Sequence, residues 1–280
     1  AVSGAIHERP SGIMNPGVFG NLAVLLFFIA LVFSQYESFN NKIFTFTSLF
    51  FGLFSIIIVG TRGAWLSFLI LLVIYLYFIY QQKNKFRKKI KFLVLSIIIS
   101  LLLLGSFNEY VNNRLHSSYT QLQNWTTTAD SGSKNINSVS ERLEMYKAAV
   151  NNIKEVPFFG HGYRTSNVVL FKNDLSPIGK LALGYNHLHN AYLTNYFNGG
   201  VVLLGALLII LFAPLSIFIK AYRQNLNDPA IIAGVLLTIG YFSFGLVNIL
   251  LGDTYMNGFY VFFLALFMLL TNKSKKILEK

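Results

Sequence analysis

The hydrophobic positions of the chain gather into long, nearly uninterrupted runs, and short polar segments separate them. A helix needs about 20 mainly apolar residues to cross a bilayer, because lipid offers no partner for unsatisfied backbone groups. Seven runs meet or approach this length: Val18–Phe33, Ile43–Val59, Ala64–Tyr80, Phe92–Phe107, Tyr196–Ile219, Ala230–Leu251 and Gly258–Leu270. The pattern predicts an all-α integral membrane protein, a polytopic helical bundle.

The basic residues predict the orientation of these spans. The segment "QQKNKFRKKIK" carries six lysines and arginines between residues 83 and 91, and short basic loops stay on the cytoplasmic side. Counting alternately from it, the loop with Lys220 and Arg223 and the basic C-terminal tail also fall inside. We therefore expect four spans in residues 1–107, one long periplasmic loop containing helices in residues 108–195, and three spans with a cytoplasmic tail in residues 196–280.

Composition agrees with a membrane protein, since 54% of residues are hydrophobic and 12% are charged. The formal charge of +12 is explained by membrane orientation, so nucleic acid is not an expected partner. The absence of cysteine excludes disulfides and thiolate chemistry. The first residues, "AVSGAIHERPSG", are neither a signal peptide nor a span, and we expect native sequence with further spans to precede them.

The long outer segment contains one clear helical pattern. In "SERLEMYKAAVNNIKEV", apolar residues recur at helical spacing from Leu143 to Ile153 and include Val150, with Ser140 as the expected N-cap and Pro157 just past the end. Before it, "TTTADSGSKNINSV" is typical of a flexible loop, and after it "PFFGHGYRTSN" is typical of a glycine-rich turn. The pattern predicts an amphipathic helix near the outer surface.

Arginines on the outer side run against the charge trend of this chain. Arg62 lies between two apolar runs, and Arg9 and Arg142 lie in outer segments. Guanidinium groups bind phosphate oxygens through paired hydrogen bonds, so several of them converging would suit a pyrophosphate. The alternatives are snorkelling for Arg62, an ordinary surface position for Arg9, and for Arg142 an ordinary surface position or a salt bridge within its helix. Arg114 and Arg164 are outer arginines as well.

His187 and His189 lie immediately before a predicted span, in "YNHLHNAYL". Imidazole titrates near neutrality, which suits a general base that accepts a hydroxyl proton. The alternatives are two hydrated histidines at the membrane border, or a metal site completed by His161 and Asp174. The chain contains no Gly-x-Ser-x-Gly elbow, no P-loop and no paired-carboxylate pattern.

Three ordered pieces carry a family resemblance: "TRGAWLSF", "SERLEMYKAAVNNIKEVPFFGHGY" and "HLHNAYLTNYFNGGVVLLGALL". Together they resemble the O-antigen ligase and polymerase family of bacterial membrane glycosyltransferases. The resemblance implies the lipid-dependent glycosyltransferase fold and a glycan donor linked to undecaprenyl pyrophosphate. It places the family arginines at Arg62 and Arg142 and the family histidine at His189, with Arg9 and His187 as further substrate-binding residues. It implies neither metal nor cofactor.

We therefore expect an O-antigen ligase that transfers the glycan to a sugar hydroxyl of lipid A-core, with inversion. The site would face the periplasm from the bacterial inner membrane, and the partners would be the carrier-linked glycan, the lipid A-core acceptor and membrane lipids. The alternatives are a polymerase of the same family, a related oligosaccharyltransferase, or a polysaccharide transporter. Functional charges lie at span ends and in outer loops, whereas a transporter would carry them near the middle of the membrane.

Overall fold

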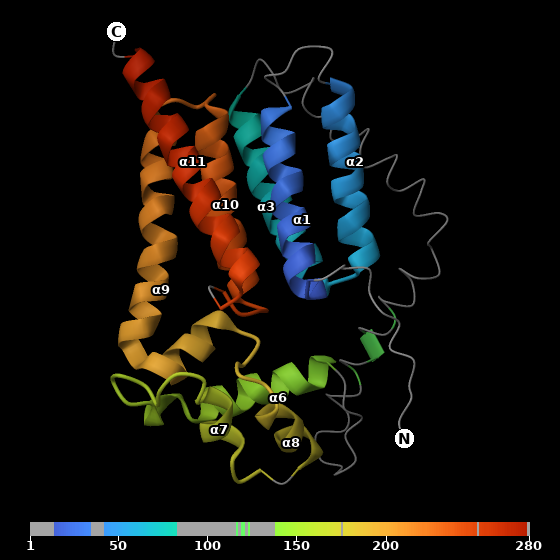
Figure 1. The fold of residues 1–280 in the computed structure, drawn as a ribbon, viewed down its shortest axis with the longest axis vertical. Coiled ribbons are helices and arrows are strands. Elements are labelled where there is room, and N and C mark those ends of the chain that lie inside the picture. The colour runs from blue at the N-terminus through green and yellow to red at the C-terminus, as the bar shows by residue number, and fades with distance from the viewer. Residues whose placement is uncertain are drawn as a thin grey trace. The chain divides into compact units, whose positions relative to one another are not determined.

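The computed structural model describes residues 14–34, 42–82, 116, 119–120, 123, 138–174, 176–250 and 252–278 (Figure 1). Its membrane helices are α1 (Pro16–Phe33), α2 (Lys42–Val59), α3 (Arg62–Gln81), α9 (Ala191–Gln224), α10 (Pro229–Gly245) and α11 (Thr254–Leu278). Four of them have a segment long and apolar enough to cross a membrane, namely α1, α3, α9 and Thr254–Asn272 of α11, while α2 and α10 contribute shorter apolar helices. The predicted all-α polytopic membrane protein is confirmed.

Six of the seven apolar runs coincide with helices, but several helix ends differ from the predicted ones. α9 begins at Ala191 rather than Tyr196, α10 ends at Gly245 rather than Leu251, and α11 extends well beyond both ends of its run. At α9 and α11, polar residues at the helix ends form helical hydrogen bonds without adding to an apolar run, so a hydropathy pattern misses them. The run Phe92–Phe107, the preceding basic segment, the polar loop before residue 138, Arg9 and Arg114 lie outside the described residues.

The chain divides into two compact units. The first comprises the described residues within Ala1–Phe107, Pro214–Gly240 and Asp253–Lys280. In it, α1 packs against both α2 and α3 (Figure 1). The rings of Phe27, Phe28 and Phe68 cluster with centroids 5.3 to 5.4 Å apart. This aromatic core fixes the positions of α1 and α3.

The turn between α2 and α3 determines where Arg62 lies. Gly60 adopts a φ of 60°, which glycine reaches at little cost, and Arg62 is the first residue of α3. The indole nitrogen of Trp65 donates to the carbonyl oxygen of Ile56 at 3.0 Å and bridges the two helices. Arg62 is half-buried at this helix start.

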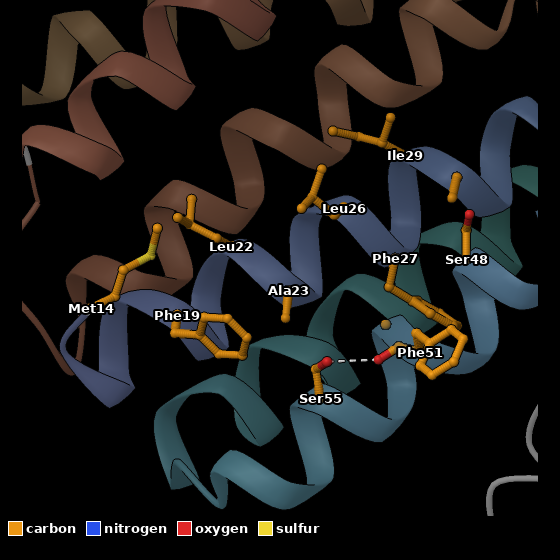
Figure 2. Close-up of a pocket in the computed structure, with 12 residues that line it drawn as sticks. Met14, Phe19, Leu22, Ala23, Leu26, Phe27, Ile29, Ser48, Phe51 and Ser55 are labelled. Atoms are coloured by element: carbon orange, nitrogen blue, oxygen red, sulfur yellow. Dashed lines mark hydrogen bonds between the residues drawn. The ribbon is translucent and has the colours of Figure 1, made fainter. Parts of the chain in front are cut away.

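An apolar groove of about 510 Å³ lies along α1 and α2 (Figure 2). Its lining includes Phe19, Leu22, Leu26, Phe27 and Phe51. The hydroxyl of Ser55, one of its polar groups, donates to the carbonyl oxygen of Phe51 at 2.7 Å. The groove is therefore suited to hydrocarbon.

The second unit comprises the described residues within Asn108–Ala213 and Tyr241–Gly252. Three helices outside the spans surround the start of α9: α6 (Ser138–Asn151), α7 (Ser166–Phe171) and α8 (Pro177–Leu183). A 3-10 turn at Ile153–Glu155 follows α6. Their shared core contains Met145, Ala149, Phe171, Ala182, Leu188 and Phe197. This core supports the segment that carries His187 and His189.

The predicted amphipathic helix is confirmed as α6, and Pro157 lies past its end. Its buried face differs from the predicted apolar stripe. Val150 and Ile153 are exposed, whereas Ser140 and Glu141 are buried. Ser140 lies inside the first turn because the helix begins at Ser138, so the expected N-cap role was wrong. The polar residues of this buried face adjoin the candidate site.

Candidate functional site

The segment between α8 and α9 holds its two histidines on one side. Leu188 is fully buried in the unit's core, and the histidines on either side of it turn toward each other. The rings of His187 and His189 accordingly lie 4.4 Å apart, nearly perpendicular at 82°. A buried leucine therefore anchors a pair of imidazoles.

Polar side chains at the start of α9 fix this segment. Asn190 caps the helix by accepting the Leu193 N–H at 3.0 Å, and its side-chain amide donates to the carbonyl oxygen of Leu246 at 3.1 Å. The Thr194 hydroxyl accepts the Leu188 N–H at 3.0 Å. Side-chain caps of this kind satisfy helix-start donors, so the asparagine after His189 has a structural role.

His189 has a strained backbone, with a φ of 53°. Such a conformation is uncommon for residues other than glycine and persists where the surroundings impose it. The Tyr146 hydroxyl on α6 donates to the His189 carbonyl oxygen at 2.9 Å, and the His189 N–H donates to Nδ1 of His187 at 3.1 Å. Because Nδ1 accepts this bond, His187 carries no proton on that nitrogen.

His187 is held from α7. The Asn167 side-chain amide donates to the His187 carbonyl oxygen at 3.2 Å and to that of Ala182 at 2.7 Å. Asn167 is itself buried. Contacts from α6, α7 and α9 thus orient the two histidines.

The electrostatics of the site favour neutral imidazoles. Burial, the neighbouring His187 and the charge of Arg142 together lower the pKa of His189 to about 3, and burial is the largest of the three causes. Burial and Arg142 also lower the pKa of His187. Desolvation disfavours the charged form, and a nearby positive charge disfavours a second one. Both histidines therefore carry no net charge at pH 7.

Glu141 and Tyr185 are the acidic side chains of the same cluster, and they form a hydrogen bond with each other. Burial raises the pKa of Glu141, and the hydrogen bond from Tyr185 and the charge of Arg142 act in the opposite direction. One oxygen of the Glu141 carboxyl group is buried and, among the described residues, has no hydrogen-bonding partner. The Tyr185 ring lies 4.9 Å from that of His189, nearly perpendicular to it at 72°. Glu141 thus reaches His189 through Tyr185.

The predicted site residues fall into three groups. Arg142, His187 and His189 share one electrostatic cluster in the second unit. Arg62 begins α3 in the first unit, and Arg9 precedes the described residues, so their convergence with this cluster stays a prediction.

Sequence reasoning missed Tyr146, Asn167, Tyr185 and Glu141 as members of the cluster. Tyr146 and Glu141 adjoin Arg142 on one helix, a signal that was available. Tyr185 stands two residues before His187 in the same stretch, which was a further signal, whereas Asn167 gave none because it comes from a separate segment.

The residues considered for a metal shell are engaged elsewhere. The His161 ring stacks on that of Phe197 at 6.3 Å, and the Asp174 carboxylate accepts the Ser176 N–H at 2.9 Å. Across the described ranges, no group of three or more histidine, cysteine, aspartate or glutamate side chains is placed to hold a metal ion.

The fold defines a polytopic membrane protein, and the cluster of Arg142, His187 and His189 outside its membrane helices is a candidate site. The family model described as O-antigen ligase matches residues 47–209, and the chain belongs to this family. The match includes Arg62, Arg142, His187 and His189. An uncharacterized protein of Haemophilus influenzae is 27% identical over 214 residues, which cover 74% of this chain and 51% of the relative. The chain thus spans about half the length of that relative.

Proposed function

We propose that this protein is an O-antigen ligase that transfers a glycan from undecaprenyl pyrophosphate to a sugar hydroxyl of lipid A-core at the periplasmic face of the inner membrane. The observation that carries the proposal is the pairing of an outer arginine with two neutral histidines. Arg142 offers charge to an anionic leaving group, and His189 offers a lone pair to a hydroxyl proton.

The reaction is a single displacement. The acceptor hydroxyl gives its proton to His189, and its oxygen forms a bond to the anomeric carbon of the donor sugar. The bond between that carbon and the diphosphate oxygen breaks, and its electron pair leaves on the diphosphate. Arg142 and Arg62, with Arg9 as a further contributor, stabilise the negative charge that develops there. One displacement at the anomeric carbon inverts its configuration.

The negative charge of the donor makes His189 a stronger base. With a pKa of about 3, His189 accepts a proton poorly while the site is empty. An anionic diphosphate beside Arg142 offsets the charge that opposes imidazolium, so donor binding raises the pKa of His189. Proton removal from the acceptor is thereby coupled to the presence of the donor.

The groove along α1 and α2 supports a lipid-linked donor. Its lining is mostly hydrocarbon, so a polyprenyl chain can pack along it by van der Waals contact in place of lipid tails. The groove belongs to the same unit as Arg62. Part of the carrier's chain would lie in it.

Complementation of a strain that lacks the native protein tests this function. The strain would receive full-length wild type, His189→Ala, or His161→Ala as a matched control from the same unit, each checked for its level in the membrane. Loss of high-molecular-weight lipopolysaccharide with accumulation of carrier-linked polymer, in His189→Ala alone, supports the ligase. Accumulation of single repeat units would identify the polymerase instead. A wild-type ladder in His189→Ala would refute the role of His189.

A further inference from the structure

The segment Phe158–Arg164, here called the aromatic loop, displays large apolar side chains. Phe158, Phe159 and Tyr163 are 63%, 73% and 80% exposed. The two phenylalanine rings contact each other edge to face at 5.0 Å, and the Arg164 guanidinium lies 5.2 Å from the Tyr163 ring centre. Exposing a phenylalanine ring to water is unfavourable, so two adjacent exposed rings represent a substantial unsatisfied apolar surface.

The backbone of this loop is fastened to α9. The N–H groups of His161 and Gly162 each donate at 2.9 Å, to the carbonyl oxygens of Phe197 and Asn198 respectively. In return, the N–H of Val201 donates to the carbonyl oxygen of Phe158 at 3.1 Å. These bonds hold the rings at one level of α9.

That level is where the apolar outer surface of α9 begins. Gly199 and Gly200 interrupt the helix, and beyond them Val201, Val202 and Leu203 are 50%, 48% and 39% exposed. α9 is a candidate span with 22% of its most apolar window buried, so much of its surface is available to lipid. The Val201 N–H that binds Phe158 thus belongs to the first residue of this surface.

We propose that the aromatic loop is a membrane anchor, in which Phe158 and Phe159 insert into the phospholipid interface beside α9. The two rings continue the apolar surface that starts at Val201, while Tyr163 and Arg164 suit the headgroup level. Aromatic side chains are enriched at both edges of a bilayer. The anchor is independent of the function proposed above.

A glycan-binding surface is the competing use of exposed aromatic rings. Ligand sites combine apolar contact with a few convergent polar groups that fix orientation. The two phenylalanine side chains supply no such group. Their continuity with the lipid-facing helix therefore favours phospholipid.

Single-cysteine labelling tests the anchor, because the chain contains no cysteine. Phe159→Cys and, as the matched control, Lys180→Cys on α8 would carry a polarity-sensitive fluorophore in the full-length protein, reconstituted in phospholipid vesicles. Both side chains are exposed within the same unit, so neither change leaves a cavity in the core. Phe158→Cys serves as an independent second position.

The label at residue 159 is expected to emit at shorter wavelength than the control and to be quenched at least threefold more by lipids carrying a shallow quencher than by aqueous iodide. The label at residue 180 is expected to show the reverse. Equal quenching of both labels by iodide would overturn the anchor. Protection of residue 159 that appears only when an oligosaccharide is added would also overturn it and assign the loop to glycan binding.

Discussion

The interruption of α9 at Gly199–Gly200 gives a sharp stability prediction. Gly200 has φ 61° and ψ −154°, a region essentially restricted to glycine, and a Cβ atom there would overlap the carbonyl oxygen of Phe158. Gly200→Ala therefore strains the backbone by about 1–3 kcal/mol. It also breaks the bond between Val201 and Phe158, worth about 0.5–1.5 kcal/mol. We expect a destabilisation of about 2–4 kcal/mol.

Gly205→Ala is the matched control. A Cβ atom there meets nothing within 4 Å, and alanine favours a helix by up to about 1 kcal/mol over glycine. Thermal unfolding of the purified proteins in one detergent would measure both variants. Gly200→Ala is expected to unfold about 5–10 °C below wild type, and Gly205→Ala at or slightly above it. If both variants match wild type, α9 is continuous at this point and the aromatic loop is not fastened there.

Three further predictions concern the histidine cluster. Because the pKa of His189 is about 3, kcat/KM for the donor should be nearly constant between pH 7 and pH 5. With an ordinary histidine as the base, kcat/KM would fall about 25-fold over the same range. The acid limb of the kcat profile should lie at higher pH than that of kcat/KM, since kcat reports the donor-bound enzyme. At pH 7, Glu141→Gln should unfold at the same temperature as wild type or a higher one, because the change removes a buried carboxylate with an unpaired oxygen. The difference in unfolding temperature should shrink toward pH 4.5, as the wild-type carboxyl group becomes protonated. Tyr146→Phe deletes the hydrogen bond to the His189 carbonyl oxygen, so the free energy of unfolding should fall by about 1 kcal/mol. Glycan transfer, measured as product formed, should fall at least tenfold. Equal transfer by wild type and Tyr146→Phe would contradict a positioning role for Tyr146.

The spans were predictable because lipid forces the backbone into continuous helix, and this requirement leaves long apolar runs in the sequence. Several helix ends were not predictable, since they depend on polar contacts. α9 begins at Ala191 because Asn190 caps it, and no apolar run records that contact. The interruption at Gly199–Gly200 sits within a continuous apolar pattern, where two glycines were the one available signal.

The key side chains of the cluster were predictable by type, and their arrangement was not. Arginine and histidine in the predicted outer segments indicate anion binding and proton transfer from chemistry alone. Their proximity depends on α6 and the segment before α9, which lie some forty residues apart and meet over the core around Leu188. The positive φ of His189 and the supporting bonds of Tyr146 and Asn167 arise from that packing.

The same packing gives His189 its particular chemistry. Burial is the largest cause of its lowered pKa, and burial persists when an anion enters the site, whereas the opposing charge of Arg142 is offset as soon as a diphosphate lies beside it. Our proposed mechanism therefore needs Arg142 and His189 to be neighbours. Arg142 then holds the leaving group, and the pKa of His189 rises when the diphosphate offsets the charge of Arg142. A histidine farther from Arg142 would be protonated more readily in the empty site and would gain less basicity from the donor. Placing Arg142 on α6, next to the segment that carries His189, meets this requirement without any additional residue.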